Sequence, residues 1–315
     1  MPSAVFSYRN FCLDPEATIT NTTGSFRSDA PVTNLMTPRL ADVAIAATSP
    51  PGNLFEVVFR PGSPSVGVPV RLVALLNHNI VSFPDNFPSP FNMTIYDVNG
   101  KVYYNETPEG LIRSVGADGS FQNHAFFLIP ADATDLSGLD LGPLDLSRIA
   151  QFSVGLSAEV VCGTMHPYTG QVDVQPFQAG GLWAGPIFQP INGISLDGFS
   201  QSAADNSRVM RSIGAQVWAT PETRQRTASI EFSKLYESEV YRLLPETSLQ
   251  QMAAYCGISR PMIMLPISSD DDLVYLAGIY GYAASPPKWV STEKSPLNGV
   301  RERLYTASLD LVEAR

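Results

Sequence analysis

Histidine and cysteine are scarce in this sequence, which has three of each among 315 residues. Catalysis needs a nucleophile or a bound metal beside an oriented base, and both commonly draw on these two residue types. The sequence also contains no G-x-S-x-G, H-E-x-x-H, Walker A or G-x-G-x-x-G pattern. We therefore predict no catalytic residues, no metal site and no cofactor, and expect that the chain is not an enzyme.

The few histidines and cysteines stand apart from one another. His78 ends an apolar run between Asn77 and Asn79, so we interpret it as a hydrogen-bonding histidine that shapes the following loop, rather than a general base. His124 and His166 have no carboxylate or cysteine at ligand spacing. The cysteines show no C-x-x-C spacing, so we predict buried free thiols rather than a disulfide framework or zinc site; they are Cys12, Cys162 and Cys256.

Positive charge is also limited: 20 basic residues against 30 acidic ones give a net charge of −10, and no run of Lys or Arg is present. Binding to phosphate backbones requires clustered cations, so nucleic acid is not an expected partner. No apolar run approaches the about 18 residues that suggest a membrane-spanning helix, and the first residues lack the basic and apolar regions of a signal peptide. We expect a soluble chain that is not exported by this route and has no stable membrane insertion.

Aspartate residues gather in two places. Four punctuate a loop rich in Leu, Gly and Pro, and three follow one another later in the chain, but neither set has EF-hand spacing. Solvated turns are the first interpretation and a calcium site is the alternative. The residues are Asp132, Asp135, Asp140 and Asp145 in the first set, and Asp270, Asp271 and Asp272 in the second.

Proline and glycine, by contrast, are abundant at 26 and 23 residues, and they separate short runs of Val, Ile, Phe and Leu. This pattern is typical of short strands joined by shaped loops, so we predict a mainly β protein. Asn99-Gly100 marks a hairpin turn between two of the strands. The strands expected in the first half are 54–59, 70–76, 91–96, 101–104, 125–129 and 149–161.

The second half begins with a strand and changes period. Residues 227–232 alternate apolar and polar positions, and from Tyr236 a helical stripe follows, with Ser233 as the expected N-cap and Pro245 as the break. Thr247 begins a capping box before a second helix that Gly257 should end. Further strands are expected at 262–265, 273–280 and 303–312, which gives a smaller α+β domain with a Pro-broken helix.

Several stretches together form a pattern that is found in a known family: 34–40, 55–59, 70–79 with Asn77-His78-Asn79, 91–97 with Gly100, 151–156, 181–186, 207–214 and the segment from Arg226 onward. The earlier stretches are similar to the discoidin-like, galactose-binding-like jelly roll of bacteriophage tail proteins, and the later ones are similar to the C-terminal module of siphophage minor tail and distal tail proteins. The resemblance extends over residues 34–315.

The resemblance implies a discoidin-like β-sandwich followed by the α+β domain. We place a polar N-terminal arm at 1–33, the sandwich at 34–175, a Gly/Pro/aromatic connector at 176–200 with Trp183 as a buried anchor, and a C-terminal tail-assembly domain at 201–315. A polar arm has little apolar surface to bury alone, so we expect neighbouring subunits to order it.

The expected function is that of a structural, non-enzymatic component of a virion: a siphophage tail tip or baseplate protein made in the host cytoplasm. Its expected partners are copies of itself in a three-fold or six-fold ring and other tail proteins. In an extended loop at 285–296, Pro286 and Pro287 exclude a helix. The candidate interface residues are Trp289, Pro286 and Pro287, with packing of Trp289 inside its own chain as the alternative.

A different class of function remains open. A carbohydrate-binding module that attaches to host surface glycans would stack aromatic rings on sugars and bind hydroxyl groups with polar side chains. Packing on a strand face explains the same tyrosines equally well. The candidate residues are Tyr103, Tyr104, Asn105 and Arg113.

Overall fold

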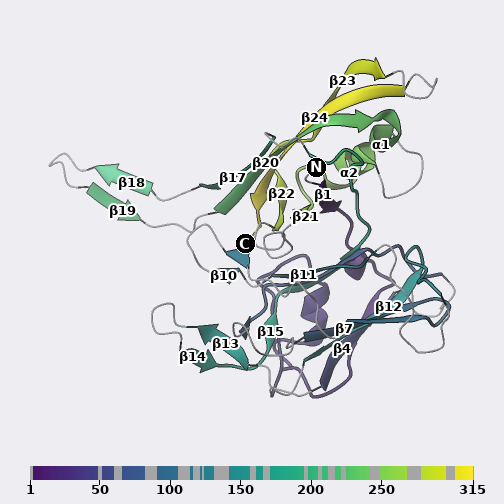
Figure 1. Cartoon of the computed structure of the whole chain (residues 1–315). Helices are drawn as coiled ribbons and strands as arrows, with labels where there is room; N and C mark the ends of the chain where they lie inside the picture. Colours follow the sequence, from purple (N-terminus) through teal and green to yellow (C-terminus); the bar gives the residue numbers. More distant parts are fainter. Residues whose placement is uncertain are drawn as a thin grey trace. The chain divides into compact units, whose positions relative to one another are not determined.

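The computed structural model shows a mainly β protein (Figure 1). The chain divides into two units, each with its own hydrophobic core: a sandwich unit (Asn10–Arg113 and Asn123–Pro186) and a C-terminal unit (Met1–Arg9, Ser114–Gln122 and Ile187–Arg315). The structure describes residues 3–48, 52–59, 66–81, 91–105, 114–115, 121–122, 124–130, 142–156, 161–165, 171–194, 198–204, 208–211, 217–220, 225–241, 248–267, 278–295 and 302–314.

The sandwich unit contains two main antiparallel sheets. The five-stranded sheet has the order β2 (Thr18–Asn21), β4 (Gly52–Val58), β12 (Ile149–Leu156), β7 (Phe91–Asp97) and β8 (Val102–Asn105). The three-stranded sheet has the order β11 (Ala125–Leu128), β5 (Leu72–Leu76) and β16 (Gly181–Gly185). Smaller elements are η1 (Phe11–Leu13), η2 (Val32–Met36), β3 (Ala44–Ile45) paired with β15 (Gln178–Ala179), and β13 (Val161–Met165) paired with β6 (Ile80–Val81) and β14 (Val172–Val174).

Both sheets contribute to one core. In the five-stranded sheet, Phe152 of β12 lies opposite Val57 on one side and Ile95 on the other, and all three are buried. Val73 and Leu75 of β5 join the same cluster from the other sheet. Since alternate residues of a strand point to one face, the period-2 pattern in the sequence fills this core.

The predicted strands of this unit are present, with shifted ends. The expected strand 149–161 corresponds to two: β12 ends at Leu156 and β13 begins at Val161. The Asn-Gly hairpin joins β7 to β8 as predicted, and Gly100 has a φ of +81°, which glycine adopts without steric cost.

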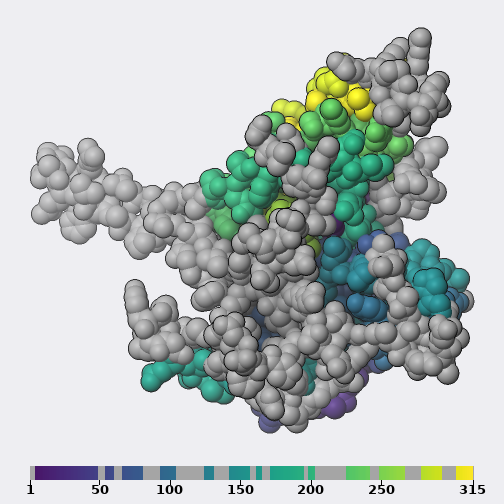
Figure 2. All heavy atoms as spheres, in the orientation of Figure 1, coloured from purple at the N-terminus to yellow at the C-terminus, as the bar shows by residue number. Residues whose placement is uncertain are grey.

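The C-terminal unit is built on a seven-stranded antiparallel sheet. Its order is β1 (Ser3–Ser7), β21 (Met262–Ile267), β22 (Ile279–Ala283), β24 (Glu302–Glu313), β20 (Gln225–Tyr236) and β17 (Phe199–Ala204), with β23 (Lys288–Ser295) also paired with β24. Part of this sheet, coloured green to yellow, is open to view in Figure 2. Two further strand pairs are β9 (Ser114–Val115) with β10 (Phe121–Gln122), and β18 (Arg208–Arg211) with β19 (Val217–Thr220).

Two helices, α1 (Glu237–Tyr241) and α2 (Leu249–Cys256), add their apolar side chains to the core under this sheet. Ile230 and Phe232 of β20 share that core with Met252 of α2 and Met264 of β21, so the strand, the helices and the strand that follows them pack together as one unit. No helix in the described part of the chain is long and apolar enough to cross a membrane.

The predicted helix boundaries are partly wrong. Ser233 is not an N-cap, because β20 continues to Tyr236 and α1 begins at Glu237. The second helix is capped by Ser248, whose side chain accepts a hydrogen bond from the amide of Gln251, so the cap lies one residue after the expected Thr247. Gly257 ends α2 as predicted. The break at Pro245 lies outside the described residues.

The predicted N-terminal arm at 1–33 is wrong. Ser3–Ser7 forms β1 and pairs with β21 over five residues, and Phe6 is fully buried with its ring near those of Phe188 and Phe232. Residues from Asn10 onward belong to the sandwich unit, through η1 and β2. The short Ala-Val-Phe run is therefore a core strand, completed by a partner more than 250 positions away in the chain.

The predicted connector at 176–200 is not a separate segment either. Gln178–Gly185 supplies β15 and β16 of the sandwich unit, and the residues from Ile187 belong to the C-terminal unit. Trp183 is only 2% exposed, so the expectation that it is buried is confirmed. It lies in β16 opposite Ala74, and is therefore part of a sheet rather than of a linker.

Candidate functional site

Of the four residues proposed to bind sugar, the structure describes the side chain of Tyr103 alone. Tyr103 lies in β8 opposite the buried Ile95 and packs, half-buried, against the core of the sandwich unit. Packing on a strand face therefore explains Tyr103. Tyr104 and Asn105 are also in β8, but their side chains, and all of Arg113, lie outside the described residues.

Trp289, the candidate interface residue, packs within its own chain. Its Nε1 donates a hydrogen bond of 2.8 Å to Oη of Tyr241 in α1, and its half-buried ring packs against the core. The predicted loop at 285–296 is wrong because Lys288–Ser295 forms β23 on the edge of the sheet. Before this strand, Pro286 is exposed and Pro287 is buried.

Apolar residues are nevertheless exposed near α1 and β23. The exposed fractions are 41% for Tyr241, 64% for Val290 and 74% for Ile191. Ile191 is held beside α1 because its amide donates to Oε1 of Glu239 over 2.6 Å. The other oxygen of this buried carboxylate accepts from the amide of Tyr236, the residue before the helix. Glu239 thus closes the first turn of α1 and fixes the neighbouring segment.

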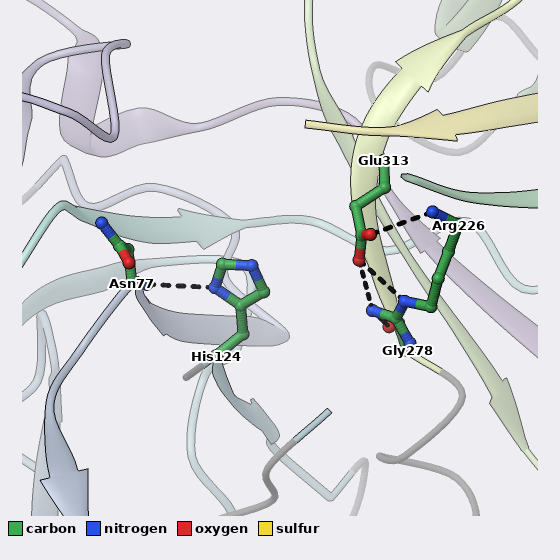
Figure 3. Close-up of polar contacts among 5 residues, drawn as sticks. All are labelled: Asn77, His124, Arg226, Gly278 and Glu313. Atoms are coloured by element: carbon green, nitrogen blue, oxygen red, sulfur yellow. Dashed lines mark hydrogen bonds and ion pairs between the residues drawn. The ribbon is translucent and has the colours of Figure 1, made fainter. Parts of the chain in front are cut away.

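The side chains of the Asn77-His78-Asn79 motif, which contributes to the family resemblance, form hydrogen bonds with backbone groups. His78 is buried, and its Nδ1 accepts from the amide of Ile80 at 3.2 Å, as expected of a loop-shaping histidine. Nδ1 of the buried His124 accepts from the amide of Asn77 at 3.0 Å (Figure 3), and Asn77 has a φ of +52°. Both histidines therefore act as acceptors at Nδ1, which requires that nitrogen to be unprotonated.

The two asparagines of the motif tie separate segments of the unit together. Nδ2 of Asn79 donates to the carbonyl of Pro176, and Oδ1 accepts from the amide of Gln178, both at 2.8 Å. Nδ2 of Asn77 donates to the carbonyl of Leu40. The motif therefore joins the end of β5 to the segment before β15 and to the region of η2.

The side chain of Asp97 likewise accepts hydrogen bonds from backbone amides, at the hairpin between β7 and β8. Its Oδ1 accepts from the amides of Asn99 and Lys101, at 2.7 and 2.9 Å, and its Oδ2 accepts from the amide of Asp145 at 3.1 Å. Of the two aspartate sets, the described part includes only Asp145; the others lie outside it. The described residues contain no group of three potential metal ligands.

An ion pair that sequence reasoning missed lies inside the C-terminal unit. Nη2 of Arg226 and Oε1 of Glu313 are 2.6 Å apart, and the side chains are 7% and 0% exposed. The same guanidinium donates to the carbonyl of Gly278 at 2.9 Å, and the amide of Arg226 donates to Oε2 of Glu313 (Figure 3). The alternation of side chains along β20 predicts the burial of Arg226. It is in phase with the buried Ala228 and Ile230, so its side chain is directed inward.

The three cysteines are buried free thiols, as predicted. Burial raises the pKa of Cys162 and of Cys256 to about 12, and it also raises the pKa of Cys12. Sγ of Cys256 contacts the carbonyl of Tyr8 at 3.3 Å, next to β1. Thiols in such surroundings are poor nucleophiles, because the thiolate is the reactive form.

No protein-family model matches this chain, and no curated protein matches it.

Proposed function

We propose that this chain is a structural, non-enzymatic component of a bacteriophage tail tip or baseplate, located in the virion and packed with copies of itself and with other tail proteins. The proposal begins from the sequence resemblance. Its support within the structure comes from what the resembling residues do.

The observation that carries the proposal is the use of the motif's polar groups. Asn79 and Asp97 direct their side chains to backbone amides and carbonyls of their own unit, and Nδ1 of His78 does the same. A buried polar group that is satisfied in this way stabilises one arrangement of loops. The motif thus has the chemistry of a scaffold, which is what a subunit of a mechanical assembly requires.

The alternative proposal, attachment to host glycans through the sandwich unit, receives no support from Tyr103, because its ring packs against the core. Attachment to glycans can be tested separately. A glycan array with the full chain would support attachment if it showed saturable, sugar-specific binding that was lost in Tyr104→Ala.

The decisive experiment is to locate the chain in purified particles. An antibody against the chain should label the tail tip in electron micrographs of negatively stained particles, and mass spectrometry should find the chain in a fixed number of copies per particle. A tail fibre or head protein of the same particles serves as the positional control. Absence of the chain from particles, with free chain remaining in the lysate, would reject the proposal.

A further inference from the structure

The hairpin turn between β7 and β8 contains one of the three Asn-Gly pairs of the sequence. Glycine has no side chain to shield its backbone nitrogen, so that nitrogen can reach the side-chain amide of a preceding asparagine. The pairs are Asn99-Gly100, Asn192-Gly193 and Asn298-Gly299, and the last lies outside the described residues. Two sites with the same local sequence can therefore be compared in the structure.

The pair in the hairpin, Asn99-Gly100, is open to solvent. Both residues are exposed, and a methyl group placed on Gly100 would meet nothing within 4 Å. Nδ2 of Asn99 lies 3.4 Å from Oδ2 of Asp97, which is long for a hydrogen bond. The side-chain amide of Asn99 is therefore weakly held and has room to turn toward the nitrogen of Gly100.

The second pair, Asn192-Gly193, is held more firmly. Asn192 is half-buried, Gly193 is buried, and Nδ2 of Asn192 donates a hydrogen bond of 2.7 Å to the carbonyl of Lys234. In both pairs the glycine amide donates to the carbonyl three residues before it, at 3.1 Å for Gly100 and 3.0 Å for Gly193. Restraint of the glycine nitrogen is therefore common to the two sites, and the side-chain contact distinguishes them.

We propose that Asn99 is a site of spontaneous deamidation in the folded protein. The nitrogen of Gly100 loses its proton to hydroxide and bonds to Cγ of Asn99, the bond between Cγ and Nδ2 breaks, and the amide nitrogen takes up a proton and leaves as ammonia. The product is a five-membered succinimide ring. Water then opens the ring at either carbonyl and gives aspartate or isoaspartate, so the sum is an exchange of ammonia for water. This chemistry goes beyond the proposed function and does not depend on it.

The modification places a negative charge beside the carboxylate that holds the hairpin. Asp97 is only 3% exposed and accepts hydrogen bonds from the amides of Asn99, Lys101 and Asp145. A carboxylate at position 99 replaces the Nδ2 donor, and like charges at such a distance repel each other. The isoaspartate product also lengthens the backbone of the turn by one carbon. Ageing of the protein is therefore expected to weaken the hold of Asp97 on the amide of Asp145.

Hydroxylamine tests the proposal because it cleaves a chain at succinimide rings. Folded wild-type protein at mildly alkaline pH should be cut after Asn99 about tenfold faster than after Asn192, because the second site must first break the bond to Lys234. The same protein in concentrated urea is the matched control: unfolding removes both environments, so the two sites should be cut at equal rates. Without hydroxylamine, peptide mass spectrometry should find a gain of about one dalton at Asn99 before Asn192.

Two variants separate the chemistry from its consequence. Asn99→Gln, whose longer side chain forms the ring poorly, should abolish cleavage at this site and leave cleavage after Asn192 unchanged. Asn99→Asp imitates the charge of one product, so its Asp145 amide should exchange with deuterium faster than in Asn99→Gln. Cleavage after Asn99 that is no faster than after Asn192 in the folded protein, or that occurs in urea alone, would overturn the inference. Equal exchange in the two variants would overturn the loss of hold on Asp145.

Discussion

Arg226 and Glu313 stand 87 positions apart in the chain, yet the guanidinium and carboxylate form an ion pair of 2.6 Å with almost no exposure to solvent. The pair joins the beginning of β20 to the end of β24, the two long central strands of the C-terminal unit. It is therefore a sensitive point in the stability of that unit.

Removing one charge of this pair should be costly. Glu313→Gln keeps an acceptor for the Arg226 amide but leaves the guanidinium buried without its counter-charge, and we expect a loss of about 3–5 kcal/mol. In the double variant Arg226→Met/Glu313→Gln the orphaned charge is gone, so most of this loss should be recovered. Urea unfolding of both variants measures the difference; equal losses would show that the guanidinium contributes through contacts other than the ion pair.

The N-terminal strand should be part of the folded core. Phe6→Ala removes a fully buried ring between Phe188 and Phe232, and truncations of this kind cost about 3–5 kcal/mol. Ile258→Ala, at an exposed position of the same unit, should change the free energy of unfolding by less than about 0.5 kcal/mol. If the two changes lowered the free energy of unfolding by the same amount in denaturant melting, residues 3–7 would be a dispensable arm rather than part of the core.

The hydrogen bond from Asn77 to His124 should stabilise the turn after β5. His124→Phe keeps a ring beside Phe126 but removes Nδ1, which takes away the acceptor of the part-buried Asn77 amide and should cost about 1 kcal/mol. Comparison with His124→Ala separates this effect from lost packing. Hydrogen exchange of the Asn77 amide gives the direct readout: unchanged protection in the Phe variant would contradict the bond.

Burial of the thiols makes a prediction about pH. Cys162 and Cys256 have a pKa raised from 9.0 to about 12, so the folded protein keeps protons that the unfolded chain releases above pH 9. Their contribution to stability is therefore complete below pH 9 and is lost as pH rises from 9 toward 12. At pH 8 a thiol reagent should leave the native protein unmodified and label three cysteines after denaturation. Rapid labelling of a thiol in the native protein would contradict their burial.

Several features of the fold follow from sequence alone because their causes are local. The alternation at 227–232 places Ala228, Ile230 and Phe232 on one buried face, whatever strand lies beside them. The turn at Asn99-Gly100 and the end of α2 at Gly257 depend on positive φ, a property of a single residue. Free thiols followed from the spacing of three scattered cysteines.

Tertiary contacts determined the secondary structure of those segments whose local sequence signals were weak or in conflict. Residues 3–7 look polar at their ends, and only pairing with Ile263–Ile267 makes them a core strand. At 288–295 the preceding prolines suggested a loop, but these residues form a strand along the free edge of β24. The Trp-Val-Ser-Thr run has residue types that favour strands, and its backbone groups form hydrogen bonds with β24. The inward direction of Arg226 followed from alternation, but its counter-charge came from the far end of the chain. Long-range partners of this kind depend on the order of the strands in the sheet, and a single sequence does not show which strands will be neighbours.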